Sequence, residues 1–311
     1  MLADQDINNL QPGTKVFTWE LKNKLGQGDF GPVYETTLAG KKYAIKLEKT
    51  SAPMQMLKLD AYVLTEIGKR QANHFCKIQD MGKYHEVNFI VMNKIGKSLV
   101  DLMKAHPEQK LSVSSGLGVG IQVVEALQEL HSIGYIHRDV KPSNICIGTF
   151  DANELKKVYL ISFGIARKFT DSTGKPRRPR ETAEFRGTVR YASMSCHMNK
   201  ELCRKDDLES LMYILVEWIC GKVPWKGVGD VQSIYSAKLG ARMDPASLFT
   251  PPCSLADMQK LMVMIDSTSY YDVPNYAGII AIIRKALQSG GQQGVPWDWE
   301  CGKQLYQFAL T

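Results

Sequence analysis

The spacing of apolar residues changes once along this chain of 311 residues, near residues 93–96, and this change constrains the fold more than any other feature. From Phe17 to about Met92, short alternating runs broken by glycines predict strands, with one predicted helix over residues 54–68. Helices with an apolar face and a closing glycine are predicted afterwards, at 117–134, 206–221 and 276–291. We therefore expect an α+β fold class, with a small β-rich N-terminal lobe and a larger helical C-terminal lobe.

The composition is that of an ordinary globular protein, with 44% hydrophobic and 23% charged residues. No apolar run is long enough to cross a membrane, and the first residues lack the apolar stretch of a signal peptide. Seven scattered cysteines without metal-ligand spacing predict free thiols in a reducing compartment. We therefore expect a cytoplasmic protein without a membrane partner, and a nuclear location stays open. The net charge of +7 favours anionic partners without choosing among them.

The residues from Gly26 to Val33, GQGDFGPV, have the form G-x-G-x-x-G-x-V. Glycines in this pattern also open dinucleotide-binding folds, but there a helix follows directly, whereas here two strand-like runs meet at Ala39-Gly40. The loop is therefore predicted to cap a hairpin, where its backbone N–H groups can approach phosphate oxygens without side-chain clashes. On this motif alone, a plain hairpin turn remains the alternative interpretation.

A lysine lies among apolar residues in the strand-like run YAIK, at Lys46. A lysine in such surroundings needs a partner for its charge, and this one follows the glycines closely enough to reach phosphates beneath them. A lysine at a sheet edge is the alternative, and on this motif alone it is the stronger one.

The run YIHRDVKPSNI, from Tyr135 to Ile145, is the most specific motif in the chain. A predicted helix ends just before it, and a strand-like segment follows. Asp139, Lys141 and Asn144 gather a base, a cation and an amide able to bind a metal in one turn. A structural loop seldom needs all three groups, so the motif favours a functional role.

Ser162-Phe163-Gly164 follow the apolar run VYLI. With the glycine loop, AIK and HRDVKPSN, in this order and spacing, they resemble the eukaryotic protein kinase domain over about residues 18–290. The lysine two places after Asp139 resembles the serine/threonine subclass. The run from Glu184 to Trp225, with YAS and then CH where most kinases carry Ala-Pro-Glu, resembles the casein kinase I superfamily, and most of all its tau-tubulin kinase branch.

This resemblance implies a bilobal kinase fold that uses ATP and Mg²⁺. The expected plan is a loose leader over 1–14, an N-lobe over 15–92, a hinge over 93–96 and a C-lobe over 97–311 that includes a C-terminal extension.

The resemblance also assigns roles to individual residues. Lys46 would hold the α- and β-phosphates with Asp60 as its carboxylate partner, and Asp139 would accept the proton of the substrate hydroxyl. Lys141 would steady the transferred phosphoryl group, and Asn144 would bind a metal. The residues expected around ATP are Gly26, Gln27, Gly28, Gly31, Val33, Ala44, Lys46, Asp60, Met92, Asn93 and Ile95. Supporting roles are expected for Arg138 as a positioning residue, Asp207 as a brace of the catalytic loop and Arg284 as a structural cation.

Two positions depart from the family pattern. Asp60 stands where glutamate is usual, so we expect a longer ion pair or a helix that lies closer. Ser162 stands where a metal-binding aspartate is usual, and a neutral hydroxyl is a weaker ligand for Mg²⁺. Two hypotheses follow: a serine/threonine kinase with weakened activity, or a pseudokinase that binds nucleotide or docks to regulate a partner protein.

The segment after Ser162 is rich in arginine and lies where a kinase has its activation segment. Arg190, Arg186 and Arg178 are expected to form an anion pocket for acidic or already phosphorylated protein substrates. Solvated loop charges are the alternative, least so for Arg190. A nucleic-acid partner is not expected, since no interleaved aromatics accompany the basic residues. The oligomeric state stays open.

Overall fold

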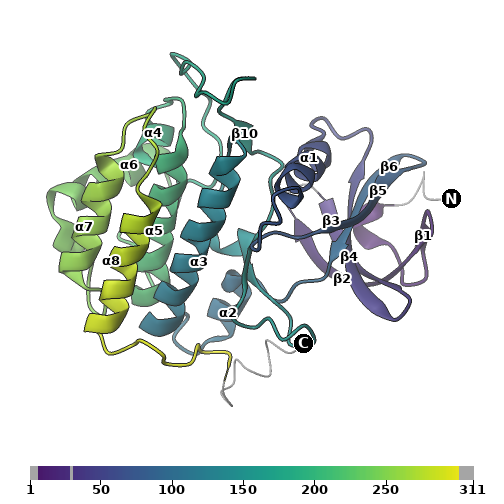
Figure 1. Cartoon of the computed structure of the whole chain (residues 1–311), viewed down its shortest axis with the longest axis horizontal. Coiled ribbons are helices and arrows are strands. Elements are labelled where there is room, and N and C mark those ends of the chain that lie inside the picture. The colour runs from purple at the N-terminus through teal and green to yellow at the C-terminus, as the bar shows by residue number, and fades with distance from the viewer. Residues whose placement is uncertain (1–5, 29–30, 301–311) are drawn as a thin grey trace. The chain divides into compact units, whose positions relative to one another are not determined.

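The computed structural model describes residues 6–28 and 31–300, and the chain divides into two compact units (Figure 1). The first unit comprises Met1–Ile95 and Ile161–Ile165, and the second comprises Gly96–Leu160 and Ala166–Thr311. A six-stranded sheet dominates the first unit, and helices dominate the second. This confirms the predicted α+β class. The boundary after Ile95 lies within the stretch expected to be a hinge.

The sheet of the first unit has the strand order β1-β2-β3-β4-β6-β5, and every neighbouring pair is antiparallel. Its strands are β1 (Lys15–Val16), β2 (Trp19–Gly28), β3 (Gly31–Leu38), β4 (Lys41–Lys49), β5 (Ile78–Tyr84) and β6 (Val87–Asn93). Gly28 of β2 pairs with Gly31 of β3, so the glycine-rich loop joins two strands. The hairpin prediction is therefore confirmed, and a dinucleotide-binding strand–helix unit is excluded at this position.

Helix α1 (Met56–Gly68) is held to the sheet at its N-terminus by Glu48 of β4. The Glu48 carboxylate accepts hydrogen bonds from the backbone N–H groups of Met56, at 2.9 Å, and Leu57, at 3.0 Å. This satisfies two N–H groups that have no partner within the helix and places a negative charge at the positive end of the helix dipole. The helix buries one face, which also carries Asp60.

The segment expected to be a loose leader packs against the sheet, as far as it is described from residue 6 onward. The backbone N–H of Leu10 donates to the hydroxyl of Tyr34 at 3.0 Å, and that hydroxyl donates to the carbonyl of Ile7 at 2.8 Å. Ile7 and Leu10 are buried in the same cluster as Tyr34. The segment is mostly polar in sequence, so the burial of these two apolar side chains was not expected. Their burial holds the segment against the sheet. Residues 1–5 of the expected leader lie outside the described residues.

The second unit contains helices that match the three predicted over 117–134, 206–221 and 276–291, with shifted ends, and others that were not predicted. They are α2 (Leu99–Ala105), α3 (Val113–Ser132), α4 (Met194–His197), α5 (Arg204–Cys220), α6 (Val231–Met243), α7 (Leu255–Asp266) and α8 (Tyr276–Ser289). Short strands β7 (Tyr135–Ile136), β8 (Ile145–Ile147), β9 (Val158–Leu160) and β10 (Arg167–Lys168) pair as β10-β7 and β8-β9. Figure 1 shows α3, α5, α7 and α8 side by side. None of the described helices is long and apolar enough to span a membrane.

Helices α3 and α5 approach closely because α3 carries glycines on the facing side. A Cβ atom at Gly116 would lie 2.9 Å from Ile219 Cγ1, and one at Gly120 would lie 2.6 Å from Leu215 Cδ2. Neither contact is compatible with normal van der Waals spacing, so only glycine fits at these two positions. Helix α5 is buried along almost its whole length, in agreement with its apolar run from Leu211 to Val216.

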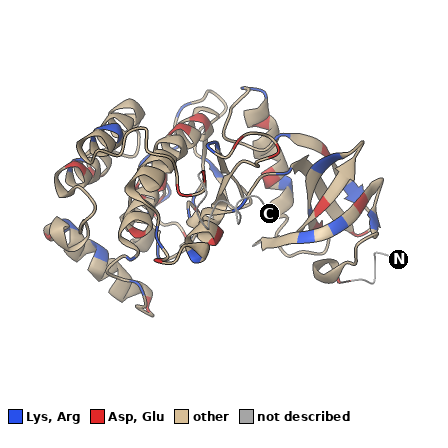
Figure 2. Ribbon diagram, turned by 90° about the horizontal axis from the view of Figure 1, so that it is seen from below, with Lys and Arg blue, Asp and Glu red and all other residues tan. Residues whose placement is uncertain are grey.

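The C-terminal extension packs on the helical unit as far as it is described, to Glu300. Trp299 is fully buried and its Nε1 donates to the carbonyl of Leu155 at 2.9 Å. Asp298 accepts from the backbone N–H of Ser112, the N-cap of α3, at 2.8 Å. Residues 301–311 of the extension lie outside the described residues. Figure 2 shows basic and acidic residues interspersed along the ribbon of each unit.

The packed N-terminal segment generates a stability prediction. Tyr34→Phe removes the hydroxyl and leaves the Leu10 N–H without its acceptor in a buried position, so we expect a loss of about 1–3 kcal/mol in the free energy of unfolding. Urea denaturation measures this loss. Tyr271→Phe is the control, because Tyr271 is 56% exposed, and we expect a change within about 0.5 kcal/mol. Equal effects of the two substitutions would show that the segment is not held by Tyr34.

Candidate active site

Lys46 and Asp60 form a buried ion pair at the centre of the first unit. Lys46 Nζ on β4 lies 2.5 Å from Asp60 Oδ2 on α1, and the two residues are 5% and 2% exposed. The other carboxylate oxygen, Oδ1, accepts a hydrogen bond from the backbone N–H of Phe163 at 2.8 Å. Of the two alternatives expected for aspartate, the longer ion pair is not found, since Asp60 reaches the lysine at hydrogen-bonding distance; a helix that lies closer remains the other alternative. The residue therefore joins β4, α1 and the 161–165 segment.

The glycine-rich loop lies against Lys46. A Cβ atom built on Gly28 would lie 3.9 Å from Lys46 Cε, and Val33 pairs with Lys46 across β3 and β4. Gly31 has a φ of +142°, and a Cβ there would lie 2.0 Å from the carbonyl oxygen of Leu47, so only glycine fits. Asp29 and Phe30, at the tip of the loop, lie outside the described residues. The space beside Lys46 is thus bordered by backbone rather than by bulky side chains, which suits a phosphate group.

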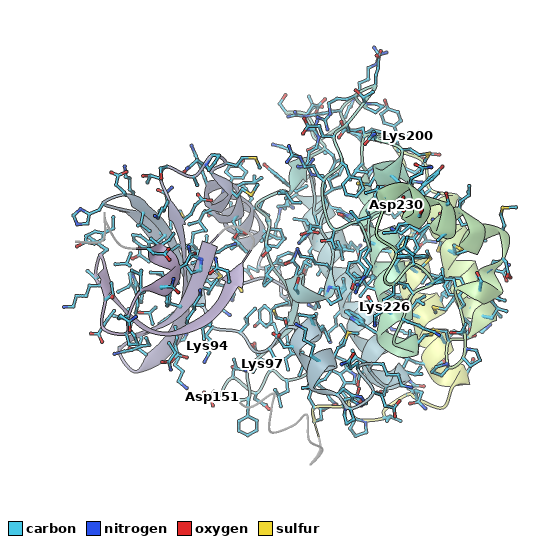
Figure 3. All side chains as sticks on the ribbon, turned by 180° about the vertical axis from the view of Figure 1, so that it is seen from behind. Lys94, Lys97, Asp151, Lys200, Lys226 and Asp230 are labelled. Atoms are coloured by element: carbon cyan, nitrogen blue, oxygen red, sulfur yellow. The ribbon has the colours of Figure 1, made fainter. Side chains whose placement is uncertain are left out.

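The residues expected around an adenine ring lie on adjacent strands and just after them. Ala44 of β4 pairs directly with Met92 of β6. The side chain of Asn93 accepts a hydrogen bond from the backbone N–H of Lys77 at 2.7 Å, so this side chain supports the strand end. Lys94, labelled in Figure 3, forms an ion pair of 2.6 Å with Glu35 of β3.

Ser162 adopts a left-handed backbone conformation, with φ of +69°. Aspartate and asparagine adopt this conformation more readily than other non-glycine residues, so serine here carries some backbone strain. The next residue, Phe163, is fully buried and its ring lies 5.7 Å from that of Phe75. Phe163 is therefore anchored by its ring and by its N–H bond to Asp60, and these contacts hold Ser162 in place.

The catalytic-loop residues converge on Asp139 in the second unit. Lys141 Nζ lies 2.9 Å from Asp139 Oδ2, and the hydroxyl of Thr188 donates to Oδ1 at 2.7 Å. The side-chain amide of Asn144 donates to the backbone carbonyl of Asp139 at 2.9 Å. This leaves the Asn144 amide oxygen as the atom able to ligate a metal. The structure therefore brings together the three residues singled out in HRDVKPSN.

Asp207 of α5 braces this loop, as expected. Its carboxylate accepts hydrogen bonds from the backbone N–H groups of His137, at 2.8 Å, and Arg138, at 2.9 Å, and lies 2.9 Å from His131 Nε2. Burial raises the pKa of Asp207, but the hydrogen bonds and charges of its partners, His131 first among them, together outweigh burial and lower this pKa. His131 also lies 2.7 Å from the hydroxyl of Tyr276, and burial lowers its pKa. His131 therefore supports the loop through Asp207.

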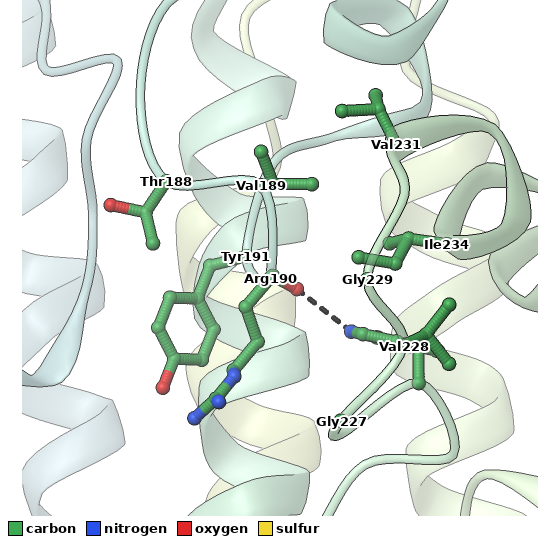
Figure 4. Close-up of a pocket in the computed structure, with 10 residues that line it drawn as sticks. Thr188, Val189, Arg190, Tyr191, Gly227, Val228, Gly229, Val231 and Ile234 are labelled. Carbon is green, nitrogen blue, oxygen red and sulfur yellow. Dashed lines mark hydrogen bonds between the residues drawn. The ribbon is translucent and has the colours of Figure 1, made fainter.

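Of the three arginines expected in an anion pocket, Arg190 lines a pocket formed by described residues. The pocket has a volume of about 370 Å³ and is shown in Figure 4; its lining includes Thr188, Arg190, Trp225, Val228, Val231 and Ile234. Arg186 instead pairs with Glu184 at 2.6 Å, and Arg178 is exposed. Arg186 and Arg178 do not line this pocket, so their part in an anion site stays a prediction.

Arg190 already has a partner. Its Nη1 lies 3.2 Å from Glu217 Oε1, and the hydroxyl of Tyr191 donates to the other oxygen of Glu217. Figure 4 shows the Arg190 and Tyr191 side chains extending in the same direction, and the dashed line marks the bond of 2.8 Å from Trp225 Nε1 to the Arg190 carbonyl. An anion in the pocket would therefore compete with a buried carboxylate for Arg190.

Sequence reasoning missed two cations on α6, Lys238 and Arg242, of which Lys238 holds backbone carbonyls beside the pocket. Lys238 of α6 is fully buried and donates to the carbonyls of Val189, at 2.9 Å, and Ala192, at 2.6 Å. Arg242, one turn later, pairs with Glu209 of α5 at 2.7 Å. It takes the structural role expected of Arg284, which is exposed on α8. A lysine and an arginine four residues apart in the mostly neutral sequence of α6 were the available signal.

The donors at the expected metal positions fit Mg²⁺ only in part. Asn144 offers a neutral amide oxygen and Ser162 offers a neutral hydroxyl, whereas Mg²⁺ prefers anionic oxygen ligands. Among the described residues, no group of three or more His, Cys, Asp or Glu side chains is placed to hold a metal ion. The chain's own residues therefore fit the nucleotide phosphates better than they fit the metal.

The chain is similar to known protein kinases. Residues 19–259 match the model of the protein kinase domain. The chain is 34% identical over 285 residues to a probable serine/threonine-protein kinase from Dictyostelium discoideum, covering 91% of this chain and 56% of that protein. It is 31% identical over 299 residues to the serine/threonine-protein kinase spe-6 from Caenorhabditis elegans, covering 94% and 78%. A putative serine/threonine-protein kinase from the same nematode is 31% identical over 290 residues, covering 91% and 82%.

The Lys46–Asp60 pair generates the prediction for this site. Asp60→Ala leaves a buried ammonium without its carboxylate and the Phe163 N–H without its acceptor, so we expect a loss of about 3–5 kcal/mol in stability. Glu66→Ala on the same helix breaks the exposed pair with Lys69 and should cost at most about 1 kcal/mol. Chemical denaturation of both variants makes the comparison, and similar losses would contradict the role given to Asp60.

Proposed function

The chain belongs to the protein kinase family, with serine/threonine kinases as relatives, and from this premise we propose a specific activity. It transfers the γ-phosphate of ATP to serine or threonine of acidic or already phosphorylated proteins, in the manner of casein kinase I, at a rate reduced by Ser162. The tau-tubulin kinase branch remains the nearest type by sequence motif. The chain spans only 56% of the length of the Dictyostelium relative. That the chain has a relative's kinase activity is therefore itself part of this proposal.

The observation that carries the proposal is the intact arrangement around Asp139. Its carboxylate is held between Lys141 and Thr188, and its loop is fixed by Asp207. In phosphoryl transfer such a carboxylate orients the substrate hydroxyl and accepts its proton, while a nearby ammonium offsets charge on the transferred group. A protein that acts only by docking has no chemical need of this arrangement.

The nucleotide is assigned to the first unit. Lys46, already paired with Asp60, would bind the α- and β-phosphates, with the backbone of the glycine loop covering them. Ala44, Met92, Asn93 and Ile95 would contact the adenine. Protein kinases in general use ATP with Mg²⁺, which bridges the phosphates and neutralises their charge.

Ser162 reduces the expected rate. Asn144 would supply one oxygen to the metal, and the phosphates would supply most of the rest. Losing one preorganised electrostatic group costs roughly 10²–10³ in rate in other enzymes. Since Lys46, Asp139, Lys141 and Asn144 are all present in the sequence, we expect slow catalysis rather than none.

A pseudokinase is the second candidate, and the neutral donors at the two metal positions favour it. In that case the chain would bind nucleotide, or only a partner protein, and regulate that partner without transferring phosphate. The packing of Ser162 is compatible with either function, so the distinction needs a measurement of catalysis.

Phosphate incorporation from labelled ATP into an acidic protein such as casein separates these functions. We expect slow Mg²⁺-dependent incorporation by the wild type, its loss in Asp139→Asn, and an increase of roughly 10²-fold in Ser162→Asp. An inert wild type combined with an active Ser162→Asp variant would favour the pseudokinase. Thermal unfolding with ATP adds a second readout, since ligand at 100 times its Kd stabilises a protein by about 2.7 kcal/mol. A protein that binds no nucleotide under any condition would leave docking as the function.

The choice of acidic substrates rests on Arg190. Arg190→Ala should raise the KM for an acidic or phosphorylated peptide by about fivefold, equivalent to ~1 kcal/mol for a part-exposed charge pair, and leave a neutral peptide unchanged. Glu217→Gln should lower that KM, because it releases Arg190 from its internal partner. Arg178→Ala is the matched control, since Arg178 is exposed and does not line the pocket. No difference between the Arg190 and Arg178 variants would remove the anion pocket from the proposal.

A further inference from the structure

Two free thiols of the second unit lie next to each other. Cys220 Sγ is 3.3 Å from Cys253 Sγ and 3.2 Å from the carbonyl oxygen of Thr250. Cys220 is the last residue of α5, whereas Cys253 lies just before Ser254, the N-cap of α7. The two cysteines are therefore far apart in sequence and come from separate elements. Neither takes part in the site described above.

We infer that Cys220 and Cys253 are a redox-sensitive dithiol, which a peroxide oxidises to a disulfide and a thiol reductant restores. The side chains are already in contact, so closure to a covalent bond needs only a small movement of the two Sγ atoms. Cys220 is partly exposed and Cys253 is buried. Cys220 is therefore the residue that the oxidant reaches, and Cys253 is the one that completes the bond.

The environment of Cys220 favours the reactive thiolate. The hydrogen bond with Cys253 lowers the pKa of the Cys220 thiol to about 6, and the nearby Lys110 ammonium acts in the same direction. The same bond, together with burial, raises the pKa of Cys253, so this residue keeps its proton. A thiolate of low pKa beside a protonated resolving thiol is the arrangement found in redox-sensing cysteines.

The chemistry balances with hydrogen peroxide as the oxidant. The Cys220 thiolate attacks one peroxide oxygen, the O–O bond breaks, and protonation of the leaving hydroxide releases water and gives a sulfenic acid at Cys220. The sulfur of Cys253 then attacks the Cys220 sulfur, its proton leaves with the hydroxyl group as a second water, and the S–S bond forms. Two thiols lose two electrons in total, and these reduce the peroxide oxygens.

The disulfide would close a covalent loop over residues 220–253, which includes all of α6 (Val231–Met243). Helix α6 supplies Val231 and Ile234 to the pocket beside Arg190, and its Lys238 holds the carbonyls of Val189 and Ala192. Oxidation would therefore restrict the element that supports the pocket. The bond would act on the pocket without touching Asp139 or Lys46.

The test is peptide mapping after treatment of the whole chain with hydrogen peroxide. A Cys301→Ser background is used, because Cys301 lies outside the described residues. Remaining thiols are blocked with N-ethylmaleimide before digestion with trypsin. We expect the peptides of residues 206–222 and 243–260 to be joined, with a loss of two hydrogen atoms, and to separate on reduction with dithiothreitol.

Two variants and a melting curve make the outcome decisive. Cys253→Ser should trap Cys220 as a sulfenic acid that reacts with dimedone, and Cys220→Ser should leave Cys253 unmodified. Oxidised wild type should unfold at a higher temperature than reduced wild type, and neither variant should show that shift. Unlinked peptides in oxidised wild type, or a crosslink that joins either cysteine to a different partner, would overturn the inference.

Discussion

One buried carboxylate organises the first unit. Asp60 uses one oxygen for the Lys46 ammonium and the other for the N–H of Phe163, so a strand, a helix and a segment distant in sequence meet at a single side chain. A charge this deep in a protein is stable only with a partner, which makes the three contacts interdependent. Glu48, which caps α1, sets the position of the helix and therefore of Asp60. Ser162 is placed by the same contacts, through its neighbour.

Helix α5 plays the corresponding part in the second unit. From this one helix, Asp207 holds the backbone of the catalytic loop, Glu209 pairs with Arg242, and Glu217 pairs with Arg190. Carboxylates are seldom buried unless each has donors around it, and here every one of the three does. The helix thus fixes the Asp139 loop and the Arg190 pocket through a common rigid support.

Much of this arrangement could be predicted from the sequence, because local motifs encode local geometry. The glycine hairpin, the lysine on β4 and the convergence on Asp139 follow from residues close together in the chain, and so does the change from strands to helices. The partners of the arginines could not be predicted in this way. Glu217 meets Arg190, and Glu201 meets Arg180, only after the helices have packed. The leader was misjudged for the same reason, since the burial of Ile7 and Leu10 depends on Tyr34.

The glycines of α3 set how closely this helix packs against α5, which carries Asp207. Gly116 and Gly120 let α3 come close to Ile219 and Leu215, which lie on the same helix as Asp207. A single added methyl group at either position would force the facing side chain on α5 to shift, in the helix whose Asp207 carboxylate accepts from the amides of His137 and Arg138. Substitution of these two glycines would therefore disturb the packing of the helix that holds the Asp139 loop, although neither glycine belongs to that loop.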